Sequence, residues 1–378
     1  MFVELHIIQN FGPSCLNRDD TNTPKVCEFG GFRRARISSQ CLKSAIRHYF
    51  ADYVDELKDN LGIRTKLLPR KVIDFLVKGG KDEETATNVV KTVLLKIGFK
   101  TAKKDATRTD VLLFLNNDTP DKIGQVVLDN WEAFNAKNIT KSTLDKLDTV
   151  LEDIKSDLNV DIALFGRMVA SKTDLTKDAA CYVAHALSTH KVNMEMDFYT
   201  AIDDLQEESE SGAGMMGIIM YNSSCFYRYS VVDLNQLLEN LNGNKEIAVS
   251  TLKGYLKASI NAIPTGKQTS MAAFNKPDFI LATFRSDQPW ALTNAFAQPA
   301  KVGFQNIDLI NQSVSKLEDY LKDMLELYGI PDDLKIHYCI TGDRPVKHLQ
   351  EIGIHQKSIK ELIDTLGVEA HECYSSSS

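Results

Sequence analysis

The sequence predicts an α+β fold in which short strands alternate with helices. Strand patterns occupy residues 2–9, 225–232 and 279–285, and helical patterns begin near Ser39 and cover residues 246–262. Two long stretches between these elements interrupt the order of the core, so we expect them to be excursions from it. This order of strands and helices is typical of a ferredoxin-like core.

The composition is that of an ordinary globular protein, with 43% hydrophobic and 25% charged residues among 378. This length allows one large domain or two to three smaller ones. The seven cysteines are scattered without a C-x-x-C pair, which argues against a disulfide framework or a zinc ribbon and indicates a cytoplasmic protein. The opening MFVELHII is predicted to be neither a signal peptide nor a membrane span, and no membrane partner is expected.

The first element is a strand at residues 2–9, which Gly12 and Pro13 are expected to end, followed by a loop at residues 15–24. The helix that starts near Ser39 is amphipathic. Residues 62–177 alternate helical stretches with lysine-rich connections and are predicted to form a mostly helical insertion.

A further helix is predicted for residues 178–188. Residues 192–227 contain no Lys or Arg but seven acids, and residues 211–214 (SGAG) form a flexible sequence in the middle. This pattern predicts an extended arm or hairpin. The serine run at residues 375–378 has the composition of a tail.

A basic segment at residues 30–50 stands out against the formal net charge of −7 for the whole chain. A local basic face on an acidic protein indicates a specific anionic partner. Ser38 or Ser39 can cap the following helix, and Lys43 and Arg47, four residues apart, can reach one phosphate backbone. The alternative is a solvated amphipathic helix after a polar strand. The basic residues of the segment are Arg33, Arg34, Arg36, Lys43, Arg47 and His48.

Gly266 and Lys267 lie in a second candidate for phosphate binding. Asn261 and Gln268 stand where a nucleotide-binding loop requires Gly and Ser or Thr, so that kind of loop is excluded. The remaining interpretations are a basic loop that touches a backbone phosphate and an ordinary polar turn.

No catalytic or metal site is expected. The Asp19–Asp20 doublet beside Arg18 could hold a divalent metal, but a local ion pair is the favoured interpretation. His185 and His190 are five residues apart, which does not fit two ligands on one helical face. The chain also lacks a G-x-S-x-G nucleophile motif.

Two apolar residues are candidates for contact with nucleic-acid bases. Met168 follows Arg167 in DIALFGRMVA, where the arginine could hold a phosphate and the methionine could wedge against a base, although a buried helix or strand end is the alternative. Tyr199 lies at the base of the acidic arm and could stack on a base. Because acids repel phosphates, an arm that meets nucleic acid must do so through apolar and aromatic groups, or it must clasp a basic partner, which implies a neighbouring copy of the chain.

Collinear motifs in the chain carry a resemblance to a known family. They are SCLNRDD (14–20), FGG (29–31), RRxRISSQ (33–40), LK (42–43), DIAL (161–164), GRM (166–168), AHA (184–186), TH (189–190), TAIDDLQE (200–207), FYRY (226–229), KQ (267–268), AAFN (272–275) and AF (295–296). These motifs resemble CasC, the repeated backbone subunit of Cascade, the type I-E CRISPR surveillance complex of antiviral defence. The likeness is weak from about residue 60 to 155 and after about 310.

The resemblance implies a right-hand shape. An RNA-recognition-like palm would comprise residues 1–60 and 225–378, the latter with a C-terminal helical region. A helical fingers insertion would span residues 61–180, a palm helix residues 181–192 and a thumb hairpin residues 193–224. It further implies polymerisation along crRNA, with CasA, CasB, CasD and CasE subunits and adjacent copies as partners and target DNA bound through the guide heteroduplex.

By position, the resemblance assigns Met168 to a base-displacing wedge and Tyr199 to an aromatic of the thumb, where the family often has Phe. It implies no enzyme activity and no cofactor. The residues expected to contact RNA are Arg18, Arg33, Arg34, Arg36, Ser38, Gln40, Lys43, Arg47, Arg167, Met168, Tyr199, Lys267 and Gln268.

Two other functions remain open on the sequence. One is a metal-dependent ribonuclease backbone subunit that cuts target RNA through Asp19 or Asp20, as related type III subunits do with a palm aspartate. The other is a stand-alone single-strand RNA binder without assembly.

Overall fold

The central strand of the structure is β1 (Phe2–Ser14), which lies antiparallel between β11 (Met215–Asp233) and β12 (Phe279–Arg285). Nearly every residue of β1 is buried, because both faces of the sheet are covered. The chain divides into two compact units, Met1–Asp55 with Cys181–Leu234 and Val249–Ser378, and Glu56–Ala180 with Asn235–Ala248. The computed structural model describes residues 1–136, 139–156, 159–168, 175–201, 215–301, 308–342, 344 and 346–376.

The first unit is built on a large mixed sheet, with strand order β14-β13-β12-β1-β11-β9-β3-β2 and with β8 and β10 also paired to β11. Only β13 and β14 pair in parallel among the described strands. The other elements of this unit are β2 (Val26–Phe29), β3 (Phe32–Ile37), α1 (Ser39–Tyr53), β8 (Cys181–Val183), β9 (Ala186–Ser188), β10 (Glu195–Ala201), most of α9 (Lys245–Asn261), α10 (Gln268–Met271), the 3-10 helix η3 (Leu292–Phe296), α11 (Leu309–Tyr328), β13 (Lys335–Ile340), α12 (Leu349–Ile352), β14 (Ile354–His355) and α13 (Ile359–Ser376).

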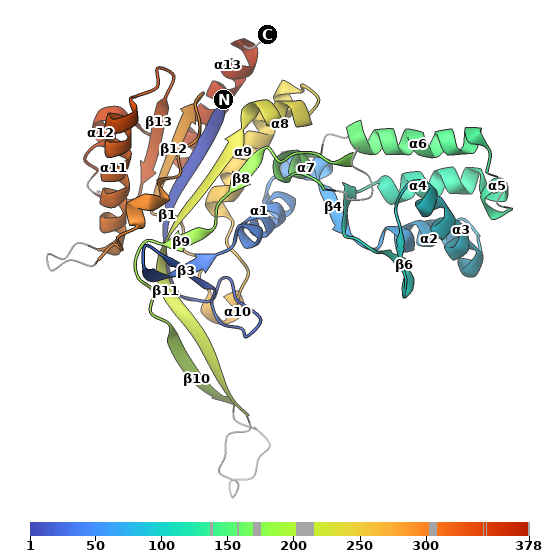
Figure 1. Cartoon of the computed structure of the whole chain (residues 1–378), viewed down its shortest axis with the longest axis horizontal. Helices are drawn as coiled ribbons and strands as arrows, with labels where there is room; N and C mark the ends of the chain where they lie inside the picture. The colour runs from blue at the N-terminus through green and yellow to red at the C-terminus, as the bar shows by residue number, and fades with distance from the viewer. Residues whose placement is uncertain are drawn as a thin grey trace, which may run out of the picture. The chain divides into compact units, whose positions relative to one another are not determined.

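Helices cover both faces of this sheet (Figure 1). Leu5 and Ile7 of β1 point toward α1 and α9, where they meet Ile46 and Tyr255. Ile8 points to the opposite face and joins a core with the apolar side of α11. The alternation of side chains along β1 therefore separates two cores, one on each face.

The second unit is mainly helical. Apolar faces of its helices form one core around Val72, Val93, Ile123 and Leu151. No described helix of either unit is long and apolar enough to cross a membrane. The elements of the second unit are the 3-10 helix η1 (Asp55–Asn60), β4 (Gly62–Thr65), α2 (Leu68–Lys78), α3 (Glu83–Lys96), β5 (Thr101–Ala102), β6 (Asp105–Thr109), β7 (Leu113–Asn116), α4 (Thr119–Asp129), α5 (Trp131–Asn135), α6 (Lys141–Ser156), α7 (Val160–Phe165) and α8 (Leu234–Asn240).

The α+β prediction is confirmed, but three element predictions are wrong. The helix expected at residues 178–188, and the palm helix at residues 181–192, are replaced by β8 and β9, because this segment pairs with β11. The first strand does not end at Gly12 and Pro13 but continues to Ser14 through an irregularity. The serine run is also part of a helix up to Ser376, the last described residue of α13.

A buried carboxylate connects three strands and a loop on the α11 face. Glu4 Oε1 accepts hydrogen bonds from the Tyr229 hydroxyl at 2.7 Å and the Trp290 N–H at 2.6 Å. Glu4 Oε2 accepts one from Thr283 Oγ1 at 2.6 Å and lies 3.4 Å from Arg285 Nη1. Burial, followed by the nearby Glu4 charge, raises the pKa of Tyr229, so this hydroxyl remains a donor.

We expect Glu4→Leu to lower the free energy of unfolding by about 3–5 kcal/mol, because it leaves the donors of Tyr229, Thr283 and Trp290 without their acceptor. Arg285 keeps its ion pair with Asp287. Thr283→Val, which removes a single hydrogen bond to Glu4, should cost only about 1 kcal/mol. Urea unfolding followed by circular dichroism measures both. Equal losses for the two variants would contradict a central role of the carboxylate.

Candidate nucleic-acid interface

The loop at residues 15–24 is fixed to the start of α1 by Asn17. Its side-chain Oδ1 accepts a hydrogen bond from the Ser38 N–H at 2.9 Å, and its carbonyl accepts one from the Lys25 N–H at 2.8 Å. Arg18 is exposed, and its Nη1 donates to Asn22 Oδ1 at 3.2 Å. The loop therefore holds Arg18 and Lys25 close to the N-terminal end of α1.

The three arginines of β3 differ in exposure. Arg33 is exposed, and Arg36 is half-buried with its Nη1 3.1 Å from His185 Nδ1. Arg34 is 0% exposed, and its guanidinium donates to the carbonyls of Ser188 at 3.1 Å and Phe296 at 2.6 Å. The prediction that Arg34 contacts RNA is therefore wrong for this structure, since the Ser188 and Phe296 backbone encloses its guanidinium.

The glycines before β3 serve the same packing. Gly30 has φ +62°, and a Cβ at this position would lie 2.1 Å from the Ala297 carbonyl oxygen. Burial also lowers the pKa of the Arg34 guanidinium. The close backbone approach at Gly30 is thus made to the protein's own chain, whereas a Cβ on Gly31 would meet no neighbouring atom of the described residues.

The N-terminal half of α1 presents the polar candidates of the basic segment. Ser38 is the N-cap, and its largely buried hydroxyl accepts a hydrogen bond from the Cys41 N–H at 3.3 Å. Gln40 is exposed, and Lys43 and Arg47 are half-buried on one side of the helix. The structure thus assigns Ser38 a capping role and leaves Gln40, Lys43 and Arg47 as accessible candidates.

Lys267 is carried by a loop that packs against the loop at residues 15–24. A Cβ on Gly266 would lie 2.5 Å from the carbonyl oxygens of both Cys15 and Leu16, so only glycine allows this approach. Lys267 is half-buried in a left-handed conformation with φ 53°. Gln268 Nε2 donates to the Pro264 carbonyl at 3.0 Å, so the Gln268 side chain braces the loop.

Arg167 and Met168 belong to the second unit and have opposite environments. Arg167 is buried, and its Nε donates to the Leu175 carbonyl at 2.7 Å. This burial contradicts the prediction that Arg167 holds a phosphate. Met168 is 85% exposed, which excludes the alternative that it lies in the core.

The predicted arm contains a two-stranded hairpin formed by β10 and the first part of β11, which projects from the sheet (Figure 1). Tyr199 is 38% exposed and lies across Gly217 on the paired strand, where an added Cβ would come within 2.4 Å of its ring. Phe198, on the opposite face, is 60% exposed and pairs with Ile218. The expected tip at residues 211–214 lies outside the described residues.

Sequence reasoning missed two contributors. His185 lies beside Arg36 because β9 follows it and pairs with β3, and burial, Arg36 and Lys25 lower the pKa of its imidazole. Phe198 is more exposed than its neighbour Tyr199, and only the strand pleat distinguishes the two. Phe198 shares its face with the exposed Met196, Met216 and Ile218.

The Asp19 carboxylate is used within its own loop. Its Oδ1 accepts hydrogen bonds from the Thr21 hydroxyl at 2.7 Å and from the N–H groups of Thr21 and Thr23. These bonds lower the pKa of Asp19. Asp20 is exposed, and within the described residues no three His, Cys, Asp or Glu side chains gather as a metal site.

Comparison with known proteins extends over nearly the whole chain. No curated protein matches it. A solved chain of a "CRISPR RNA-guided surveillance complex, pre-nicking" is 29% identical with a TM-score of 0.87, and the match covers 98% of this chain and 100% of that one. A chain of a second "CRISPR RNA-guided surveillance complex" is 26% identical with a TM-score of 0.76 and the same coverage.

The model of the CT1975-like protein family matches residues 3–365. This match confirms the resemblance that the motifs of the loop, β3 and α1 indicated. The chain therefore belongs to the CT1975-like family, which is the CasC family of type I-E CRISPR systems.

Proposed function

We propose that this chain is the non-catalytic backbone subunit of a type I-E Cascade, and that it polymerises along crRNA and displays guide bases for pairing with target DNA. The family makes it a subunit of a CRISPR RNA-guided surveillance complex. The observation that carries the finer proposal is the joining of the loop at residues 15–24, the start of α1 and the Lys267 loop into one basic surface. We call this the palm surface: Arg18, Arg36, Gln40, Lys43, Arg47 and Lys267. Arg33, exposed on the other face of β3, is proposed as a separate contact.

The topology supports the finer fold. The four core strands lie in the sheet in the order β12-β1-β11-β9, so that β1, the first of them in the chain, pairs with β12, the last. Helices α1 and α9 cover one face of these strands. This is the arrangement of a ferredoxin-like palm. The helical second unit corresponds to the proposed fingers and the β10–β11 hairpin to the proposed thumb. The domain boundaries remain part of this proposal.

The chemistry of the palm surface suits a single strand held by its backbone. Arg and Lys contacts to phosphates position a strand without reading its sequence, which leaves the bases free for pairing. Met168 and the exposed side chains of the hairpin, including Tyr199, provide apolar groups that can separate blocks of stacked bases. The described acids of the hairpin, Glu195 and Asp197, favour a neighbouring basic copy as its support.

Native mass spectrometry of the purified cytoplasmic protein, before and after ribonuclease treatment, tests the proposal. Co-expression with a CRISPR array and the CasA, CasB, CasD and CasE subunits should give multimers that carry RNA of one defined length. Ribonuclease treatment should reduce the number of subunits in these multimers or dissociate them. A monomer free of RNA under these conditions would contradict the scaffold.

A cleavage assay with the same complex distinguishes the scaffold function from the ribonuclease alternative. Cleavage of complementary RNA that needs a divalent metal and is lost in Asp20→Ala with assembly intact would support the enzyme. The engagement of Asp19 in its own loop gives that alternative no support.

Lys43→Ala or Arg47→Ala should weaken binding to all single-stranded RNA sequences alike. Each lost phosphate contact should reduce the slope of log K against log salt by roughly 0.7. Fluorescence anisotropy with several labelled oligonucleotides measures this. Lys322→Ala, on α11 across the sheet, is the matched control, and a loss confined to one sequence would contradict a phosphate role.

Met168→Ala should leave assembly and thermal stability unchanged, because its side chain is 85% exposed. It should blur the periodic accessibility of guide bases to chemical probing. Met168→Leu, which retains an apolar side chain of similar size, should preserve the pattern. A sharp pattern in Met168→Ala would exclude the wedge.

A further inference from the structure

A buried pair of side chains holds both ends of the segment that carries Lys267. The guanidinium of Arg228, from β11, donates to the carbonyl of Ser259 in the last turns of α9 and to Gln9 Oε1 at 2.6 Å. Gln9 Nε2 in turn donates to the carbonyl of Asn275 at 2.7 Å. Ser259 precedes the Lys267 loop and Asn275 follows it, so the pair joins its two ends to β1 and β11.

The segment between these ends has little freedom. Gly266 packs on the backbone of the 15–24 loop, and Gln268 Nε2 also reaches the Ala273 carbonyl at 3.3 Å. Lys267 and Ala272 both adopt left-handed conformations, with φ 53° and 46°, which non-glycine residues keep only where the surroundings impose them. The position of the Lys267 side chain therefore depends on how firmly the ends are held.

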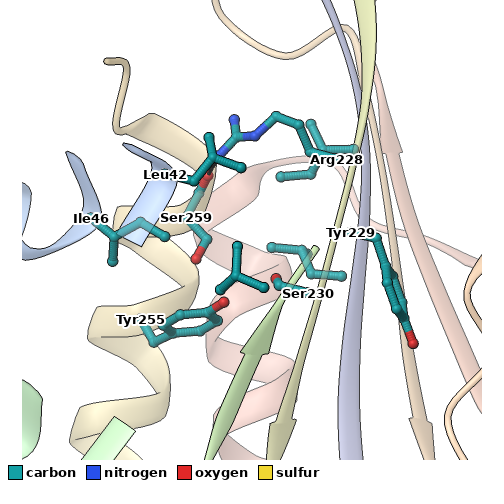
Figure 2. Close-up of a pocket in the computed structure, with 10 residues that line it drawn as sticks. Leu42, Ile46, Arg228, Tyr229, Ser230, Tyr255 and Ser259 are labelled. Atoms are coloured by element: carbon teal, nitrogen blue, oxygen red, sulfur yellow. Dashed lines mark hydrogen bonds between the residues drawn. The ribbon is translucent and has the colours of Figure 1, made fainter. Parts of the chain in front are cut away.

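Burying the guanidinium of Arg228 at this site costs desolvation energy. It lies beneath α1 and α9 beside a cavity of about 10 Å³, near Ser259 and Tyr255 (Figure 2). Among the described residues no carboxylate pairs with it, and burial lowers the pKa of its guanidinium to about 10. A buried guanidinium without a carboxylate partner carries a large desolvation cost, and its Nε has no hydrogen-bond partner in the described part of the chain, so stability alone does not account for the arginine.

We infer that Arg228, together with Gln9, is a positioning residue that sets the Lys267 loop for contact with the RNA backbone. This inference rests on the proposed function. Arg228 acts through Lys267 and does not itself touch RNA, because it is buried beneath the helices.

The test is the binding of full-length protein to a labelled oligouridine over a range of salt concentrations. Arg228→Met should weaken binding about tenfold, the effect of one charge-assisted contact, and reduce the salt slope by roughly 0.7. Lys267→Ala should do the same. Because both variants remove one contact, Arg228→Met should cause no further loss in the Lys267→Ala background.

Further variants separate positioning from loss of structure. Gln9→Met should reproduce the effect of Arg228→Met. If Arg228→Met does not fold, Gln9→Met serves as the test variant in its place. Thr283→Val, a buried change on the opposite face of the sheet, should leave the salt slope unchanged. If Lys267→Ala reduces the slope and neither Arg228→Met nor Gln9→Met does, or if the effects add, the positioning role is overturned. If Lys267→Ala leaves the slope unchanged, the phosphate contact proposed for Lys267 is itself wrong.

Discussion

The antiparallel pairing of β1 with β11 is the constraint on which the rest of the first unit depends. The two strands keep one register from Phe2 opposite Asp233 to Phe11 opposite Ser224. The earlier part of β11 pairs with β10 and forms the hairpin. Because side chains alternate along a strand, a slip by one residue would turn Arg228 away from α9 and Glu4 away from Tyr229. The pairing therefore sets the hairpin, the buried carboxylate and the support of the Lys267 loop together.

Two buried arginines give the palm surface part of its electrostatic character. Arg34 and Arg228 bind carbonyl and amide oxygens, and no carboxylate among the described residues pairs with either. Neutral partners accept from the terminal nitrogens of both guanidinium groups, while the buried Nε of each has no partner within the described residues. These partners leave the positive charges uncompensated, so the charges add to the field of the exposed basic residues. An acidic chain can thus hold a locally positive surface.

Patterns with strong local signals could be predicted from the sequence, whereas those set by tertiary pairing could not. The strand at 279–285 was predicted at its observed bounds because its apolar run is flanked by polar turns. Residues 178–188 form strands only because β11 offers them a partner. Within the site, a basic block cannot reveal which guanidinium the tertiary packing buries, so Arg34 was grouped with Arg33 and Arg36. Gln268 likewise appears polar and available in sequence, but its partners are carbonyls of its own loop.

The hairpin shows how the same pleat divides the functions of adjacent aromatics. Tyr199 lies against Gly217, where the absence of a side chain makes room for its ring and holds it in place. A ring that is already ordered loses little conformational entropy when a base stacks on it. Phe198, 60% exposed among Met196 and Ile218, instead extends an apolar face that a single base cannot cover. The two faces therefore suit different contacts, a stacked base on the side of Tyr199 and a broader apolar surface on the side of Phe198.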